Sequence, residues 1–141
     1  MVRAFRTEPV DREVLHAVVD LAARSPSAGK TQGWSVVALE GASTEVFWSA
    51  TMSAETRAEF RWRHLFAAPV ILLSFADPQA YLDRYSENDK SKTELGASVD
   101  AWPVPYWTVD ASFATMTLLL AAHDAGLGRS EEHTSELQSP C

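Results

Sequence analysis

The chain has 141 residues and carries 19 acidic against 12 basic side chains, which gives a formal net charge of −7. This charge disfavours a nucleic-acid partner, because a phosphate backbone attracts basic surfaces. Hydrophobic residues make up 46% of the chain, an ordinary value for one globular domain. The N-terminus lacks the apolar stretch of a secretory signal, and no apolar run approaches the roughly 20 residues of a membrane span. We therefore expect a cytoplasmic protein without a membrane partner.

Several common kinds of catalytic site are disfavoured. The single cysteine, Cys141, excludes a disulfide or a thiolate cluster within one chain, and the spacing of the four histidines predicts no metal site. The sequence AGKT at residues 28–31 ends like a phosphate-binding P-loop, but the first glycine of that motif is missing and a helical pattern precedes it. A GxSxG turn for a serine nucleophile is also absent. Triphosphate binding and serine hydrolysis are therefore not expected.

The first half of the chain predicts a helix, a loop and a strand. Residues 11–25 place apolar side chains at spacings of three and four, which is typical of an amphipathic helix with Asp11 as its N-cap. Pro26, Gly29 and Gly33 interrupt this pattern. Residues 34–40 are β-branched and apolar and predict a buried strand.

The second half adds helices around one further strand. The patterns predict helices at residues 44–50, 54–63, 78–85 and 108–125 and a second buried strand at residues 69–75. Residues 86–107 are irregular, and an irregular segment of this length is typical of a functional lid. Helices over a sheet indicate the α+β or α/β class, but two strands are too few for a complete sheet. We expect a partner or a missing segment to complete it.

Aromatic side chains gather where the irregular segment meets the last helix. Trp102 and Tyr106 suit either packing or a platform on which a flat substrate stacks. Trp107 lies next to the helix pattern, so we expect it to pack. Asp110 is interpreted as an acidic charge at the start of the last helix, where the helix dipole favours it.

The loop at residues 26–34, PSAGKTQGW, combines several polar groups after a helix. It offers the Ser27 hydroxyl, the Lys30 ammonium, the Gln32 amide and backbone amides freed by glycine. Such groups suit the edge of a planar polar ring or a phosphate. A loop that only caps the helix explains the same residues equally well.

An ordered set of segments resembles the nitroreductase family of flavin-dependent oxidoreductases. The resemblance covers residues 2–128 and rests on VRAF at 2–5, PVD at 9–11, PSAGKTQGW at 26–34, AAPV at 67–70, and VD at 109–110 followed by GLG at 126–128. It implies an α+β homodimer with a mixed sheet flanked by helices and two FMN molecules at the subunit interface. Hydride would pass from NADH or NADPH through flavin N5 to a nitroaromatic, a quinone or a similar small acceptor.

The resemblance also implies how such a protein works. It would supply no obligate catalytic side chain but would orient the flavin and adjust its electronic properties. Two alternatives remain open: a dehalogenase or flavin-destructase of the same fold, and a flavin- or ligand-binding fragment that turns nothing over.

The resemblance assigns cofactor-binding roles to five residues. Arg3 would lie near the flavin pyrimidine edge and stabilise negative charge there. Pro26, Ser27 and Ala28 would line the flavin, and Lys30 replaces an asparagine that is usual in the family. Lysine keeps the donor capacity of that amide but loses its acceptor.

Two neighbours in the same loop are given supporting roles. Gln32 is expected to brace the loop rather than to touch substrate. Gly33 replaces a common proline and is expected to loosen the loop.

The end of the chain differs from the rest. Residues 129–141, RSEEHTSELQSPC, are polar, and their first eleven resemble the translation of a sequencing-library adapter. We therefore expect a partial domain at residues 1–128 and a non-native tail at residues 129–141, with no function for His133 or Cys141. The family's N-terminal phosphate-binding pattern and its later N5-contacting segment are not matched, so we expect a fragment with weak FMN affinity.

Overall fold

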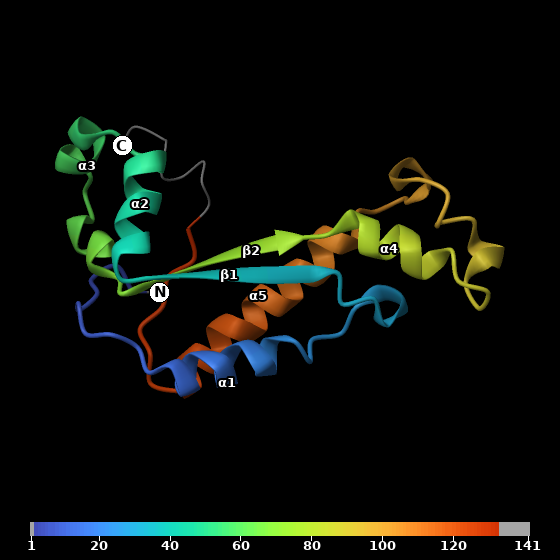
Figure 1. The fold of residues 1–141 in the computed structure, drawn as a ribbon, viewed down its shortest axis with the longest axis horizontal. Coiled ribbons are helices and arrows are strands. Elements are labelled where there is room, and N and C mark those ends of the chain that lie inside the picture. Colours follow the sequence, from blue (N-terminus) through green and yellow to red (C-terminus); the bar gives the residue numbers. More distant parts are fainter. Residues whose placement is uncertain (1, 133–141) are drawn as a thin grey trace.

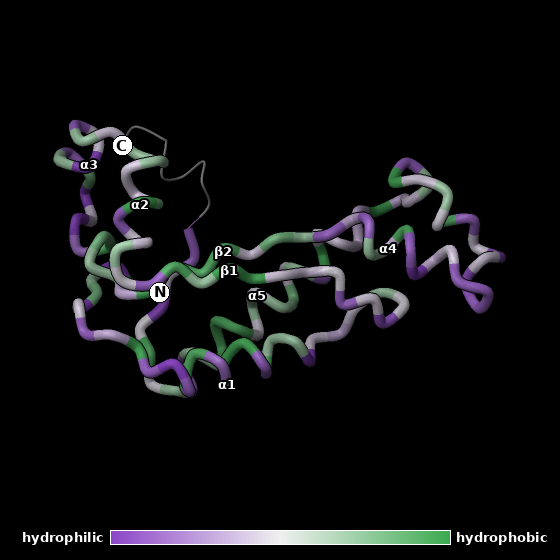
Figure 2. Tube along the Cα trace, viewed as in Figure 1, coloured by the Kyte–Doolittle hydropathy of each residue, from purple (hydrophilic) through white to green (hydrophobic). Residues whose placement is uncertain are grey.

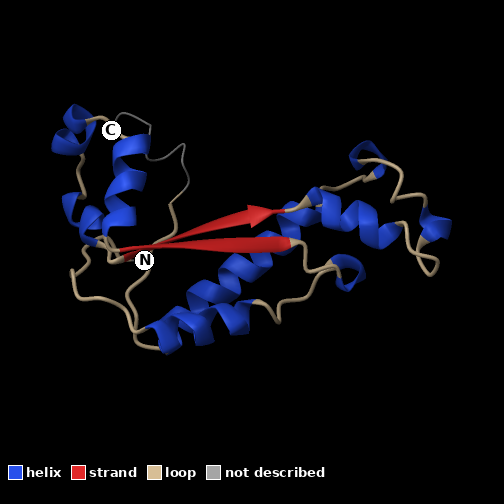
Figure 3. Cartoon of the chain, viewed as in Figure 1, coloured by secondary structure: helices blue, strands red, loops and turns tan. Residues whose placement is uncertain are grey.

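A computed structural model describes residues 2–132 of the chain; His133 and Cys141 lie outside the described residues. The helices and strands are α1 (Arg12–Ala22), β1 (Trp34–Glu40), α2 (Ala42–Thr51), α3 (Ala54–Glu59), β2 (Val70–Ala76), α4 (Pro78–Tyr85) and α5 (Tyr106–Asp124) (Figures 1 and 3). Short 3-10 turns connect them at Ala28–Lys30, Arg63–Ala67, Ser91–Thr93 and Val99–Ala101. The predicted order of elements is confirmed.

Two helices begin after an aspartate whose carboxylate caps the helix N-terminus. The Asp11 side chain accepts a hydrogen bond from the Glu13 amide at 2.8 Å, so the predicted N-cap of α1 is confirmed. Asp77 caps α4 in the same way by accepting from the Gln79 amide at 2.9 Å. The predicted strand at residues 34–40 coincides with β1.

The sheet is a two-stranded antiparallel ribbon with helices on one face. Trp34 pairs with Ala76 at one end and Glu40 with Val70 at the other. Helices α1 and α5 lie side by side along one face of the ribbon (Figure 1). Their contact forms a buried cluster of Val18, Ala22, Leu118, Ala121 and Ala122, against which Trp34 and Leu72 pack.

The opposite face of the ribbon is largely uncovered, so the prediction of two buried strands is wrong. Val37 and Phe75 point to this face and are 47% and 49% exposed. Figure 2 shows that the strands are hydrophobic along much of their length, although no second layer of the described residues covers them fully. The α+β class is confirmed, and the mixed sheet remains a prediction because the two described strands pair antiparallel.

Different helices and loops pack at the two ends of the ribbon. At one end α2, α3 and the N-terminal segment enclose a second cluster of Trp48, Met52, Phe60 and Leu65 (Figure 1). At the other end α4 and the irregular residues 86–105 extend beyond the sheet and carry many hydrophilic side chains (Figure 2). No helix among residues 2–132 is long and apolar enough to cross a membrane.

Two predicted helix boundaries are corrected. α3 ends at Glu59 rather than residue 63, because Phe60 adopts an extended conformation and is buried in the second cluster. α5 begins at Tyr106, two residues earlier than predicted, so Tyr106 and Trp107 belong to the helix and not to the irregular segment.

Candidate functional site: the loop after the first helix

The loop predicted to bind a ligand has an unusual backbone. After α1 the chain forms the 3-10 turn Ala28–Lys30, which lies at the end of the sheet nearest α4 (Figure 1). Gly29 has a φ of 63°, and the non-glycine residues Lys30 and Gln32 have φ of 58° and 53°. Left-handed conformations are unfavourable for lysine and glutamine, so surrounding contacts must hold them.

Hydrogen bonds within the loop fix its shape. The Gln32 side-chain amide donates to the Ala23 carbonyl at 2.7 Å, which confirms that Gln32 braces the loop. The Gln32 backbone amide donates to the Ser27 hydroxyl oxygen at 2.8 Å, and the Lys30 amide donates to the Ser27 carbonyl at 3.0 Å. The expectation that glycine frees the backbone amides for a ligand is therefore largely wrong, because most of these amides already have acceptors.

Side chains from distant segments anchor the loop from outside. The Ala28 amide donates to Oδ2 of Asp110 at 2.7 Å, and the same oxygen accepts from the Tyr81 hydroxyl at 2.6 Å. The Arg84 guanidinium donates through Nε to the Gly29 carbonyl at 3.0 Å. The loop is thus connected to both α4 and α5.

Asp110 is a residue whose role the sequence interpretation missed. It lies a full turn inside α5 and is only 4% exposed, so it is not a charge at the helix start. A sequence signal did exist, because Asp110 shares a helix face with Ala114 and Leu118, both of which are buried. An acidic residue on the buried face of a helix indicates a specific partner.

Gly33 does not loosen the loop, contrary to expectation. It is buried, and the ring of Tyr81 packs directly against it. The Gly33 carbonyl accepts from the Asp77 amide at 2.9 Å, which ties the end of the loop to the start of α4.

Arg3 does not join the loop within one chain. The N-terminal segment lies at the opposite end of the sheet from the loop (Figure 1). The Arg3 guanidinium stacks over the ring of Trp62, at 4.1 Å from the ring centroid. Its Nη1 also forms an ion pair with Oε1 of Glu132 at 2.6 Å. The other four predicted cofactor residues, Pro26, Ser27, Ala28 and Lys30, are consecutive or nearly so and remain together.

The aromatic residues of the irregular segment form a packed cluster beside α4. Trp102 is buried, and its ring contacts those of Tyr81, Tyr85, Tyr106 and Trp107. Its indole nitrogen donates to the Leu95 carbonyl at 2.8 Å. Trp102 therefore has a packing role, and its contact with Trp107 supports the packing expected for that residue. Tyr106 remains 39% exposed.

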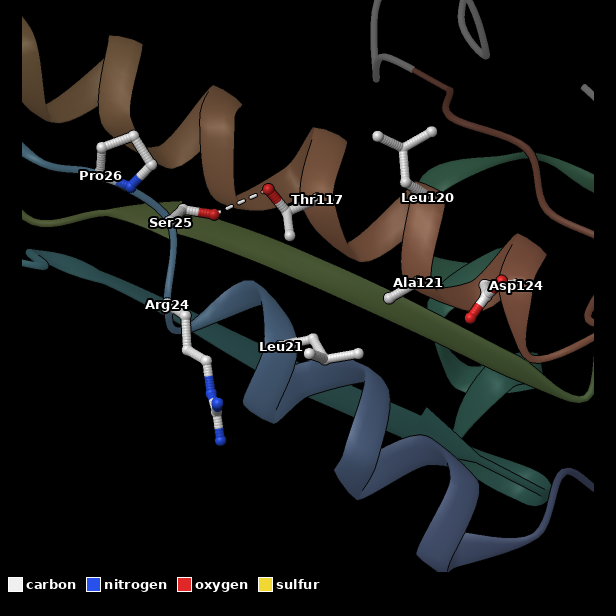
Figure 4. A pocket seen from close by; sticks show the side chains of 8 residues that line it. All are labelled: Leu21, Arg24, Ser25, Pro26, Thr117, Leu120, Ala121 and Asp124. Atoms are coloured by element: carbon white, nitrogen blue, oxygen red, sulfur yellow. Dashed lines mark hydrogen bonds between the residues drawn. The ribbon is translucent and has the colours of Figure 1, made fainter.

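A groove of about 560 Å³ runs between α1 and α5 and reaches Pro26 (Figure 4). A hydrogen bond of 2.8 Å from the Ser25 hydroxyl to Oγ1 of Thr117 joins the two walls. The groove is lined by Leu21, Arg24, Ser25, Pro26, Thr117, Leu120, Ala121 and Asp124. Most of its exposed lining is apolar, which distinguishes it from the polar loop beside it.

Two side chains of the loop offer polar groups to a ligand. The Ser27 hydroxyl accepts from Gln32 and still has its own proton to donate, while the exposed Lys30 supplies a cation. Arg3 already holds a carboxylate, which shows that its guanidinium can bind an anionic oxygen. No group of three or more potential metal ligands occurs among residues 2–132.

Helices over an antiparallel sheet, with an internally hydrogen-bonded loop at one end, define an α+β protein. Comparison with known families makes this more specific. The nitroreductase family model matches residues 1–130, so the chain belongs to the nitroreductase family.

Individual relatives agree with this assignment. An NADH dehydrogenase from Thermus thermophilus is 33% identical over 85 aligned positions, and the match covers 58% of this chain and 38% of that protein. A nitroreductase-like protein from Streptococcus mutans superposes with a TM-score of 0.67 at 16% identity, covering 89% of this chain and 66% of the other. A protein from Exiguobacterium sibiricum solved in complex with FMN gives a TM-score of 0.55 at 16% identity, covering 86% and 64%. The chain thus spans less than two thirds of the length of each of these proteins.

Proposed function

We propose that this chain is part of an FMN-dependent oxidoreductase that uses NADH or NADPH to reduce a small acceptor such as a nitroaromatic or a quinone. The observation that carries the proposal is the loop around Ser27 and Lys30, whose unfavourable backbone is held rigid by two helices in a nitroreductase-family chain. The FMN complex of the Exiguobacterium sibiricum protein supports the choice of cofactor. Pro26, Ser27, Ala28 and Lys30 would hold the FMN, which would supply two-electron transfer from the nicotinamide to the acceptor.

The proposed binding residues have separate tasks. Pro26 and Ala28 offer apolar contact to the ring, the Ser27 hydroxyl donates to a ring oxygen, and Lys30 neutralises negative charge on the reduced flavin. Because the loop is already rigid, little conformational freedom is lost when the flavin binds.

A homodimer with flavin between the subunits is part of the proposal. Arg3 and the loop lie at opposite ends of the sheet, so we infer that Arg3 of one copy approaches the loop of the other. Exposed apolar side chains on α1 and α5 support an interface between two copies along these helices, because large exposed apolar patches usually mark interaction sites. They are Leu21, Phe113, Met116 and Leu120.

The domain division also belongs to the proposal. Residues 1–128 are proposed to be the nitroreductase part and residues 129–141 a non-native tail. Glu132 of this tail pairs with Arg3, so the tail would compete with an anionic ligand for that guanidinium.

Titration of the full chain with FMN, followed by flavin fluorescence, tests the proposal. We expect saturable quenching, and we expect Ser27→Ala to weaken binding about three- to tenfold through loss of one hydrogen bond. Ser91→Ala is the matched control, because the Ser91 hydroxyl lies in an exposed turn and donates to the Asn88 carbonyl. Its affinity should equal that of the unaltered chain.

Oxidation of NADH and of NADPH by the FMN-saturated chain, with a simple quinone as acceptor, then measures turnover. Quinone-dependent oxidation supports the oxidoreductase. Saturable binding without any oxidation supports the flavin-binding fragment instead, and absence of binding contradicts both for this chain.

A further inference from the structure

Asp110 is the most deeply buried acidic side chain among the described residues and stands directly behind the proposed flavin loop. It is 4% exposed and lies on the face of α5 that packs into the protein. Burial of a carboxylate is costly unless hydrogen bonds satisfy it. Its partners therefore indicate what the residue is for.

Both donors to Asp110 converge on one oxygen atom. Oδ2 accepts from the Ala28 backbone amide at 2.7 Å and from the Tyr81 hydroxyl at 2.6 Å. These bonds join three segments that are far apart in the sequence: the loop, α4 and α5. Burial, together with the hydrogen bond to Asp110, raises the pKa of Tyr81 far above its ordinary value, so its hydroxyl remains a donor at neutral pH.

The loop needs such an anchor because its own backbone is unfavourable. Lys30 and Gln32 follow Ala28 closely and both adopt left-handed conformations. Gly29 lies between them and Ala28, and a Cβ on Gly29 would come within 2.7 Å of the Tyr85 ring. The loop is therefore pressed against α4 and held in place at the Ala28 amide.

The geometry points to Asp110 as a positioning residue that holds the Ala28–Lys30 turn in its ligand-binding conformation by accepting hydrogen bonds from the Ala28 amide and the Tyr81 hydroxyl. This inference rests on the proposed flavin site, since it explains why the conformation of that loop is fixed. Asp110 touches no ligand itself; it acts through Ala28. Tyr81 orients the carboxylate, and loss of the Tyr81 hydroxyl should have a smaller effect than loss of Asp110.

Three variants and one matched control separate local positioning from general stability. Asp110→Ala removes both hydrogen bonds. Asp110→Asn keeps an acceptor oxygen, and Tyr81→Phe removes only one donor. Thr115→Val is the control, because Thr115 lies on the same helix and donates to the Ser74 hydroxyl at 3.0 Å without any contact to the loop.

The first measurement is amide hydrogen exchange at Ala28 in the full chain without flavin, alongside urea unfolding of each variant. We expect exchange at Ala28 to accelerate about tenfold in Asp110→Ala beyond the change in global stability, because a charge-assisted hydrogen bond is lost. Tyr81→Phe should show a smaller acceleration, and Asp110→Asn should restore most of the protection. Thr115→Val should change exchange at Ala28 only in step with global unfolding.

The second measurement is FMN affinity of the same variants. We expect the dissociation constant to rise about tenfold in Asp110→Ala and to stay within about twofold in Thr115→Val. The inference is overturned if exchange at Ala28 follows global stability alike in all variants, or if it accelerates without any loss of FMN affinity. Should the unaltered chain bind no FMN, the proposed function fails for this chain, whereas the exchange result still decides whether Asp110 holds the loop.

Discussion

Gly33 and Tyr81 approach so closely that a Cβ on Gly33 would lie 2.6 Å from Cε2 of the tyrosine ring. The same Cβ would lie 3.0 Å from the Asp77 carbonyl oxygen, and Tyr81 is fully buried. Glycine is therefore needed here because there is no space for a side chain, and not because the backbone adopts a left-handed conformation.

Replacement of Gly33 by alanine should destabilise the protein. The added methyl group must displace a fully buried ring, and overpacking of this kind costs about 1–3 kcal/mol. Urea unfolding of the two proteins measures the difference. Gly128→Ala is the control, since the nearest atom to its Cβ would be 3.6 Å away, and it should change stability by less than about 0.5 kcal/mol. Equal effects at the two positions would contradict the close-approach argument.

Lys30→Asn should stabilise the chain. Lys30 has a φ of 58°, and asparagine tolerates that conformation better than lysine, so we expect a gain of about 0.5–1 kcal/mol. The melting temperature reports it. Lys92→Asn provides the comparison, because Lys92 lies in an exposed turn outside the left-handed region and should change little. A gain of equal size at Lys92 would show that the backbone conformation is not the cause.

The ion pair between Glu45 and Arg57 should make stability depend on acid pH. Two hydrogen bonds of 2.6 and 3.0 Å join the guanidinium to the carboxylate. The Arg57 hydrogen bond is the main reason that the pKa of Glu45 falls from 4.5 to about 2. A carboxylate with a lowered pKa contributes stability that is fully present above about pH 4.5 and is lost as the pH falls through about 2.

Melting curves of the unaltered chain and Glu45→Gln between pH 7 and pH 2 measure this contribution. The unaltered chain should melt at the higher temperature near neutral pH, and the difference should vanish towards pH 2. Glu59→Gln is the control, because Glu59 forms no ion pair with any of the described residues, and it should show no such trend. A difference that persists at pH 2 would mean that the ion pair is not responsible.

Met116 and Leu120 should govern self-association. They lie one turn apart on α5 and are both 57% exposed. Met116→Glu places a charge on the surface proposed to contact a second copy, which should convert a dimer to a monomer in sedimentation velocity without loss of helix content. Val46→Glu on α2, a helix that belongs to the second cluster and does not line the groove between α1 and α5, should leave the dimer intact. A monomeric unaltered chain would refute the proposed homodimer.

Local signals predicted most of the fold. The strand at residues 34–40 stands between Gly33 and Gly41, which bound it on both sides, and Asp77 with Pro78 starts α4 as such a pair usually does. The boundary of α3 was missed because Phe60 leaves the helix to pack with Trp48, Met52 and Leu65. Such packing overrides helix propensity, and the helical pattern of residues 54–63 does not reveal it.

The site was predictable only in part. The family resemblance identified the loop and gave Gln32 the bracing role that its hydrogen bond to the Ala23 carbonyl confirms. The periodicity of α5 could have indicated that Asp110 is buried, but its partner Ala28 lies 82 positions away, and no local pattern identifies that partner. Likewise, the apolar sequences of the two strands indicated burial, but Val37 and Phe75 are exposed. The apolar pattern does not reveal whether a second layer covers that face of the sheet.

The first and last described segments are held together by a hydrogen bond of 2.8 Å from the Val2 amide to the Arg129 carbonyl. A short linker between these segments would close the chain into a ring, which could then be opened in the exposed residues 91–94. Such a circular permutant would retain the pairing of β1 with β2 and both anchors of the flavin loop. The contacts that hold the loop therefore do not depend on the order of the segments along the chain.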